Sequence, residues 1–433
     1  MTIIFTLLFN YSVYSEIKNN SLTQKERSEV IKAIGKELND NYIFPDVAKK
    51  MHKHISKQNK KGRYKNIDDP MVFSNKLTED LLSISHDKHI RVSFNPEAIA
   101  RQKQAVTDEE RQKLQQQGID RFKKTNFGFK QVKILDGNIG YLDLRSFADT
   151  SFAGDTAIAV MNYLSNADAI IFDLRNNGGG SPAMIQLITS YLYNSEPVHL
   201  NNFYWRPTNL NTQTWTLPYV PGKRSPDTPV FVLTSGSTFS AAEEFSYNLK
   251  NLERATLIGE TTGGGAHPGD TVNATDRFQI WVPSGRAINP ITNTNWEGTG
   301  VVPHIKVNQE DALKTAHIKA LETIMDKSSE ESKMFYSWTL DALRLENNPV
   351  IIDSSALNSY VGNYGPRVVS LEDNSLYYQR GTGNKYKLTP MGNNKFLIKE
   401  LSYFRIQFET KDNKVTALIG TYDNGRTDKN LKD

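Results

Sequence analysis

The sequence predicts an α/β core that lies between a small helical region at the N-terminus and a small β domain at the C-terminus. Apolar residues recur at helical spacing near the N-terminus, and short apolar strands alternate with helices in the middle of the chain. The end of the chain is rich in turns and short alternating strands. With 433 residues, of which 38% are hydrophobic and 23% charged, two or three domains and a sizeable core are expected.

Composition excludes several classes of function. The net charge is +4, and no dense stripe of lysine and arginine runs along the chain, so we expect no nucleic-acid partner. The chain has no cysteine, which excludes disulfides, thiolate zinc sites and a cysteine nucleophile.

The first fifteen residues predict a remnant of a signal peptide. Residues 3–9 form an apolar run that is too short for a membrane span, which needs ~20 residues. The run resembles the apolar core of a signal peptide, although no positive charge precedes it. We therefore expect an exported bacterial protein, periplasmic or extracellular, and the alternative is a frayed tail. No other stretch of the sequence could span a membrane.

Residues 16–95 predict a small N-terminal helical domain, because their apolar residues recur every three or four positions. These apolar faces are formed by Val30, Ile31, Ile34 and Leu38, then by Val47, Met51 and Ile55, and then by Val72, Phe73, Leu77 and Leu81. Residues 96–127 are polar and rich in glutamine, which favours an exposed helical connector or lid.

Residues 128–330 predict the α/β core. A hairpin turns at Asp136-Gly137, and one helix opens at Ser181-Pro182, where proline is tolerated in the first turn. Another helix opens at Ser240. The strands expected in this core are residues 167–175, 229–234, 255–259 and 277–282. A helix over residues 307–328 closes the core, and residues 350–433 predict the separate β domain.

Ser240 is the first residue that could carry chemistry. It follows a buried strand by about six residues and opens the helix that begins at Ala241. Backbone N–H groups and the positive end of that helix would lie where an oxyanion forms. The pattern Ser240-x-x-Glu243 is also that of a capping box, so taken alone Ser240 is equally able to be a helix cap.

A glycine-rich loop follows the next candidate strand, in the run Asp173-Leu-Arg-Asn-Asn-Gly-Gly-Gly-Ser181. Gly178 and Gly179 would let the backbone approach a ligand closely and direct N–H groups at it. The run has neither the spacing of a dinucleotide-binding loop nor the lysine of a P-loop. The alternative is an ordinary turn between a strand and a helix.

His89 is the candidate base, because a serine nucleophile needs one and histidine is the usual choice. Of the eight histidines, His86 and His267 compete with it. A metal site formed by His86 and His89 lacks a completing carboxylate pattern, so we expect no metal. Glu297, in Trp296-Glu-Gly-Thr-Gly-Val-Val-Pro303, could orient a base histidine, although a loop glutamate can also be plain surface.

These segments, in this order, resemble the S41 peptidase family. The segments that carry the resemblance are Asp87-Lys-His89, Asp173-Leu-Arg-Asn-Asn-Gly-Gly179, Ser240-Ala-Ala-Glu243, Arg254 to Gly265, and Glu297-Gly-Thr-Gly-Val-Val-Pro303. Tyr42-Ile-Phe-Pro45 resembles the N-terminal domain of the branch related to the interphotoreceptor retinoid-binding protein. The resemblance covers about residues 22–325 and implies a crotonase/Clp-like α/β core.

The resemblance also implies roles for single residues. Processing peptidases of the family place a lysine base where this chain has Gly265, which excludes a serine–lysine dyad. The tricorn-like branch uses serine, histidine and glutamate, which would here be Ser240, His89 and Glu297. The oxyanion hole would consist of N–H groups from Ala241, Gly178 and Gly179.

The resemblance therefore implies a serine peptidase that needs no cofactor and acts on peptides or proteins through an acyl-enzyme. Too few residues separate the histidine segment from the core for a PDZ domain. The alternatives are a non-catalytic module that binds apolar ligands, as retinoid-binding relatives do, and an esterase-like hydrolase.

Overall fold

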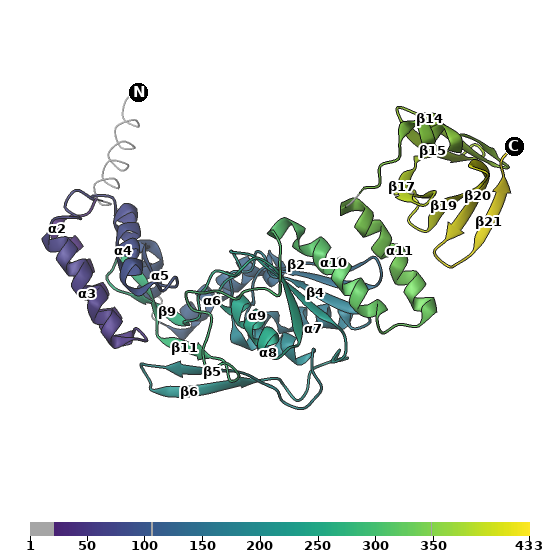
Figure 1. Ribbon diagram of the computed structural model, residues 1–433. Coiled ribbons are helices and arrows are strands. Elements are labelled where there is room, and N and C mark those ends of the chain that lie inside the picture. The colour runs from purple at the N-terminus through teal and green to yellow at the C-terminus, as the bar shows by residue number, and fades with distance from the viewer. Residues whose placement is uncertain (1–20, 105–106, 348) are drawn as a thin grey trace, which may run out of the picture. The chain divides into compact units, whose positions relative to one another are not determined.

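The computed structural model describes residues 21–104, 107–347 and 349–433 (Figure 1). The chain divides into two units, Met1–Lys133 with Gly140–Leu313, and Ile134–Ile139 with Lys314–Asp433. The expected signal segment, residues 1–15, lies outside the described residues. Within the described ranges, no helix combines the length and the apolar character that a membrane crossing requires.

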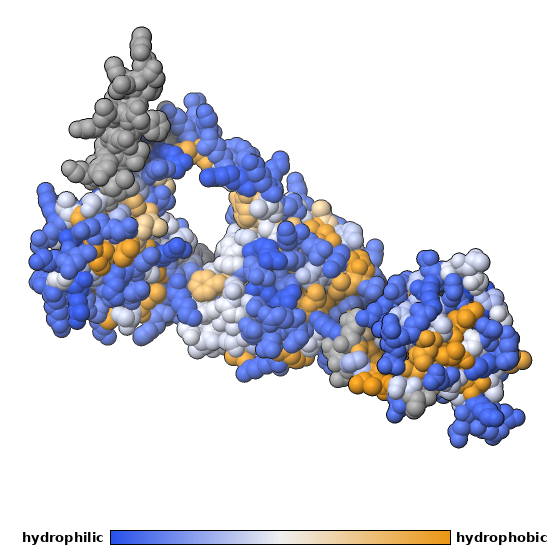
Figure 2. All heavy atoms as spheres, turned by 90° about the horizontal axis from the view of Figure 1, so that it is seen from above, coloured by the Kyte–Doolittle hydropathy of each residue, from blue (hydrophilic) through white to orange (hydrophobic). Residues whose placement is uncertain are grey.

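From residue 21 onward, the first unit begins with three helices that form the predicted helical region: α2 (Gln24–Asn41), α3 (Pro45–Lys60) and α4 (Pro70–Ser85). Thr23 and Asp69 cap α2 and α4 by accepting N–H groups of the first turn. Helix α4 ends at Ser85, and the positive φ of 57° at the following residue, His86, turns the chain toward Asp87. In Figure 2 the surface of this region is mainly hydrophilic, as expected for helices that bury one apolar face.

A six-stranded sheet forms the centre of the first unit, in the order β12-β8-β7-β4-β3-β2. Four neighbouring strands, β4, β7, β8 and β12, run parallel. Nearly every residue of β4, β7 and β8 is buried, because helices cover a parallel sheet of this kind. The strands are β2 (Phe129–Leu135), β3 (Ile139–Leu144), β4 (Ala169–Asp173), β7 (Val230–Thr234), β8 (Ala255–Gly259) and β12 (Ile305–Lys306).

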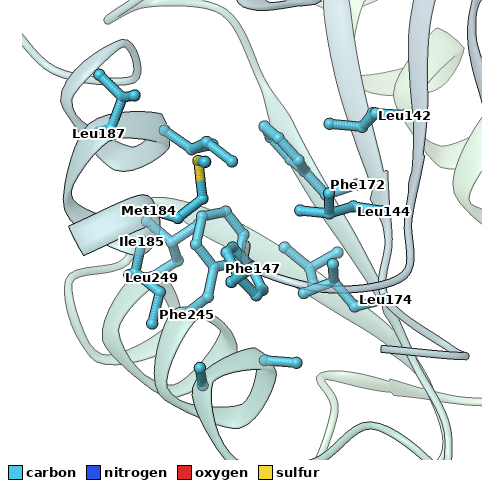
Figure 3. Close-up of a cluster of buried hydrophobic side chains, with 14 of the residues drawn as sticks. Leu142, Leu144, Phe147, Phe172, Leu174, Met184, Ile185, Leu187, Phe245 and Leu249 are labelled. Atoms are coloured by element: carbon cyan, nitrogen blue, oxygen red, sulfur yellow. The ribbon is translucent and has the colours of Figure 1, made fainter. Parts of the chain in front are cut away.

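Helices α7 (Thr150–Leu164), α8 (Pro182–Ser190) and α9 (Ala241–Asn251) belong to this core. Figure 3 shows Phe245 and Leu249 of α9 packed among Phe147, Phe172 and Met184. Phe245 lies 5.4 Å from Phe147 and 5.3 Å from Phe172 between ring centroids. This packing fixes the start of α9, which Ser240 immediately precedes, beside the carboxyl end of β7.

One predicted strand belongs to a different sheet from the one we expected. Residues 277–282 were expected in the central core, but β10 (Phe278–Pro283) pairs with β1 (Arg91–Phe94) and β9 (Gly269–Asn273). The reason lies in its buried face, since Phe278, Ile280 and Val282 pack against the N-terminal helices. A third sheet of the unit contains β11 (Gly285–Ile288), β5 (His199–Trp205) and β6 (Leu210–Trp215).

Between β1 and β2 the described residues are almost entirely helical. They form α5 (Pro96–Gln104), α6 (Asp108–Lys123) and the short η1 (Asn126–Gly128). Helix α6 has no buried residue, although Ile119 and Phe122 near its end pack on the central core. The described part of this segment contains no strand of the kind that a PDZ domain needs.

The second unit combines helices with antiparallel sheets. Its division from the first unit falls at residue 313, earlier than the expected start of the β domain at 350. Its helices are α10 (Gln309–Met325, shared with the first unit), α11 (Glu330–Asn347), α12 (Ser354–Leu357) and η2 (Asn358–Tyr360). One sheet contains β13 (Gly362–Tyr364), β14 (Arg367–Glu372), β15 (Ser375–Arg380) and β16 (Lys385–Lys387). The other contains β17 (Thr389–Gly392), β18 (Lys395–Leu397), β19 (Phe404–Lys411), β20 (Lys414–Tyr422) and β21 (Thr427–Leu431). The predicted α/β core with N-terminal helices and a C-terminal β region is thus confirmed.

Candidate active site

Ser240 lies between β7 and α9 with an unusual backbone conformation. Its φ is 55° and its ψ is −121°, a combination that costs free energy for a residue with a side chain and that must be held by its surroundings. The capping alternative is partly realised, because Ser240 precedes the first turn of α9 and its N–H donates to Glu243 Oε2 at 2.9 Å. Its Oγ, however, faces His89 Nε2 at 3.1 Å.

His89 reaches Ser240 from a segment 151 residues earlier in the chain. Asp87 Oδ1 accepts the backbone N–H of His89 at 3.1 Å and fixes the loop that carries the ring. Phe239 packs on the ring with 4.6 Å between the ring centroids. Burial lowers the pKa of His89 to about 4, against the opposing effect of the Asp87 charge. The imidazole is therefore neutral at pH 7, the form that can accept a proton from Ser240.

The glycine loop lies directly against Ser240. A Cβ on Gly179 would lie 2.8 Å from Ser240 Cβ and 3.1 Å from the Ala241 nitrogen, so only glycine permits this approach. The Gly179 N–H already donates to Asn177 Oδ1 at 2.9 Å. Within the described residues no hydrogen bond uses the N–H groups of Gly178 and Ala241. Those two donors are therefore free for an oxyanion, whereas that of Gly179 is not.

Glu297 lies beside this pair without a hydrogen bond to His89. Its Oε2 accepts the Ala266 N–H at 2.5 Å and lies 3.4 Å from His267 Nδ1. Its Oε1 and the Nδ1 of His89 are both buried and lack a hydrogen-bond partner within the described residues. Asp87 Oδ1 lies 3.8 Å from His89 Nδ1, which is beyond hydrogen-bond distance.

Three further residues of the site were not assigned a role from the sequence. Asp87 is fully buried, and its Oδ2 accepts from His267 Nδ1 at 2.8 Å. His267 had been weighed only as a rival base. Glu243, also fully buried, accepts four hydrogen bonds around the nucleophile. The short spacing Asp87-x-His89 was the one sequence signal that could have identified Asp87.

Gly265 leaves no room for a side chain. A Cβ at this position would lie 2.7 Å from His89 Cε1 and 2.3 Å from Phe239 Cζ, so the histidine ring fills the space that a side chain at 265 would need. The nearby lysine, Lys88, directs its ammonium to the Gly263 carbonyl at 2.6 Å and not to Ser240.

One group of side chains in the described ranges could hold a metal ion. It consists of Asp87, His89 and Glu297, whose possible ligand atoms lie within 4.8 Å of one another. His86, which the sequence had suggested as a metal partner of His89, is not part of it. His89 is the residue that contacts Ser240, and Asp87 and Glu297 lie beside it. The same three side chains can therefore serve acid–base chemistry.

Comparison with known sequences identifies the family. A model described as "Peptidase family S41" matches residues 138–307. A second, described as the N-terminal domain of peptidase S41 in eukaryotic interphotoreceptor retinoid-binding protein, matches residues 21–124. The chain belongs to peptidase family S41. The two matches to S41 models together include Ser240, His89 and Glu297, so every proposed catalytic position lies in a region typical of S41 peptidases.

Single relatives of this S41 chain are more distant. A carboxyl-terminal-processing protease of Synechocystis sp. is 30% identical over 128 residues, which is 29% of this chain and 28% of that protein. The chain thus spans less than a third of this curated relative's length in the matched region. The solved photosystem II D1 C-terminal processing protease is 14% identical, with a TM-score of 0.43 over 67% of this chain and 94% of that one. A lipoprotein from Streptococcus agalactiae is also 14% identical, with a TM-score of 0.43 over 69% and 96%.

Proposed function

We propose that this protein is a serine peptidase in which Ser240 is the nucleophile and His89 the general base. The observation that carries the proposal is the 3.1 Å contact between Ser240 Oγ and a neutral, buried His89 Nε2. A serine hydroxyl is a weak nucleophile until a base within hydrogen-bond reach takes its proton. The unused N–H groups of Ala241 and Gly178 support the same assignment, because acyl transfer needs donors for an oxyanion.

The chemistry follows from these positions. His89 Nε2 takes the Ser240 proton while Oγ bonds to the carbonyl carbon of the scissile amide. The carbonyl oxygen becomes an oxyanion that the N–H groups of Ala241 and Gly178 stabilise, helped by the positive end of α9. His89 then gives its proton to the leaving amine as the C–N bond breaks. A water molecule then attacks the acyl carbon while His89 takes one of its protons. The bond from the acyl carbon to Ser240 Oγ breaks, and His89 returns the proton to Oγ.

Two carboxylates beside His89 would stabilise the imidazolium that forms in each half of the reaction. Asp87 Oδ1 lies 3.8 Å from His89 Nδ1, and Glu297 lies in the same group. A negative charge at this distance in a buried site favours the charged form of the ring. We propose that Glu297 acts with Asp87 in this role, rather than through a direct hydrogen bond of its own.

We propose peptides or proteins as substrates. The test is to incubate the purified protein with a mixed peptide library and to compare its products by mass spectrometry with those of Ser240→Ala. New termini that only the unsubstituted protein produces support a peptidase. Identical product sets would remove the peptidase proposal, and retention of apolar peptides without cleavage would favour the binding module instead. Hydrolysis of simple esters alone would favour an esterase.

We also propose that the protein is exported, on the strength of the apolar run at residues 3–9. Expression of the full chain in a bacterium, followed by fractionation and N-terminal mass spectrometry, tests this directly. Export predicts a chain outside the cytoplasm that has lost about the first fifteen residues. A chain that keeps these residues and stays in the cytoplasm would contradict the proposal.

A further inference from the structure

The site contains a second buried imidazole that the proposed chemistry does not use. His267 is 4% exposed and comes from the loop after β8. Its Nδ1 lies 2.8 Å from Asp87 Oδ2 and 3.4 Å from Glu297 Oε2. One nitrogen therefore stands between the two carboxylates that lie beside His89.

The surroundings of this bridge, in which His267 Nδ1 lies between Asp87 Oδ2 and Glu297 Oε2, are mostly apolar and contain few charges. Phe44 packs edge-on against the His267 ring with 5.3 Å between centroids. The Tyr42 hydroxyl donates to Asp87 Oδ2 at 3.2 Å. Among the described residues no lysine or arginine forms an ion pair with either carboxylate. Two buried carboxylates with no cation between them would repel each other, and one would take up a proton.

We propose that His267 is a positioning residue, which bridges Asp87 and Glu297 and so holds both carboxylates beside His89. The inference rests on the proposed function, because its effect is exerted through His89 and Ser240. It assigns His267 no contact with the substrate. The contacts of its Nδ1 hold the two carboxylates in a fixed arrangement around Nδ1 of the base.

The electrostatics of Glu297 support this bridge. Burial and the Asp87 charge raise the pKa of Glu297 to about 7, whereas the charge of His267 opposes that rise. The other titratable groups beside Glu297 are His89, which belongs to the same group of side chains, and Glu243, whose charge raises the pKa of Glu297 further. Glu297 is therefore near half-ionised at neutral pH, where small changes in its neighbours alter its charge.

The experiment follows the rate at which a fluorophosphonate probe labels Ser240 as a function of pH. In this reaction Oγ bonds to phosphorus, fluoride leaves, and the hydroxyl proton passes to His89. No natural substrate is needed. The acidic limb of the profile follows the ionisation of Glu297. His267→Gln keeps a donor for Asp87 but removes the ring that opposes the rise in the pKa of Glu297, so we expect this limb to move up by about one pH unit. Asp87→Asn removes the like charge and should move that limb down.

Glu297→Gln should abolish this limb, and His304→Gln, at a histidine outside the site, should leave the profile unchanged. Should His267→Gln not fold, the downward shift in Asp87→Asn and the loss of the limb in Glu297→Gln still test the coupling between the two carboxylates. Failure of Ser240 to label at all in the unsubstituted protein would overturn the proposed function itself. Normal labelling with a His267→Gln profile that is superimposable, or merely lower at every pH, would overturn the bridge alone.

Discussion

The fully buried carboxylate of Glu243 fixes the backbone around Ser240, and its replacement by glutamine gives a sharp test of this arrangement. One of its oxygens accepts two hydrogen bonds at 2.5 and 2.6 Å, and the other accepts two at 2.9 and 2.8 Å. All four partners donate in these contacts, and three of them are backbone N–H groups, which can only donate. They are Thr262 Oγ1 and the Gly264 N–H on Oε1, and the N–H groups of Ser240 and Gly265 on Oε2.

Glu243→Gln turns one oxygen into an NH₂ group, which faces two donors instead of accepting from them. Hydrogen bonds to a charged group contribute ~1.5–3 kcal/mol each, so two lost bonds cost about 3–6 kcal/mol. Burial raises the pKa of Glu243, so the buried charge itself costs folding free energy. A neutral glutamine avoids that cost, which offsets part of the free energy lost with the hydrogen bonds. We therefore expect the lower end, about 3 kcal/mol of unfolding free energy.

The assay is thermal unfolding in a Ser240→Ala background, which prevents self-cleavage. A loss of about 3 kcal/mol lowers Tm by roughly 5 °C in a unit of this size. Glu244→Gln is the matched control, because Glu244 is equally buried on the same helix but its pKa is raised to about 7 and amide groups surround it. Its Tm should stay within about 2 °C of the parent. Equal Tm values for the two variants would refute the reasoning.

The remaining predictions concern the base and the glycines around it. The folded pKa of His89 is about 4, below its ordinary value of 6.5, so the unfolded chain binds more protons between these values and stability falls as pH drops from about 6.5 to 4. The fall is up to about 3 kcal/mol, and His89→Asn should flatten it in pH-dependent Tm measurements. Gly265→Ala places a Cβ 2.7 Å from His89 Cε1 and should slow fluorophosphonate labelling at least ~10-fold, because it displaces the base. Gly180→Ala brings a Cβ within 2.1 Å of the Phe147 carbonyl oxygen at a φ of 143° and should lower Tm strongly. Gly178→Ala meets no atom within 4 Å and should fold and label normally, since it keeps its N–H; a similar loss in both variants would contradict this account of the loop.

Local patterns were enough to predict much of the fold and the place of Ser240. The strand before Ser240 is a continuous apolar run, and the helix after it has a starting signal, so both could be read from neighbours in the sequence. The spacing of apolar residues likewise predicted α2, α3 and α4. The roles of Ser240, His89, Glu297 and the glycine loop depended on resemblance to a family and remain predictions.

What the sequence could not provide depends on contacts between distant segments. Asp87 and His267 are 180 residues apart, and no local pattern in either segment indicates that the two side chains meet. The same holds for β10, whose apolar pattern is that of any buried strand. β10 lies beside β1 because the apolar faces of both strands pack against the apolar face of the N-terminal helices. The hydrogen bond from Gly179 to Asn177 depends on the geometry of a turn, and the residue types in that turn do not specify this geometry.

The central claim is that Ser240 is a nucleophile activated by His89. The most direct measurement is the mass of the intact protein after treatment with a fluorophosphonate, followed by peptide mapping of the adduct. We predict a single adduct on Ser240, no adduct in Ser240→Ala, and labelling slowed at least ~100-fold in His89→Ala. An unlabelled Ser240, or labelling that proceeds at the same rate without His89, would contradict the claim.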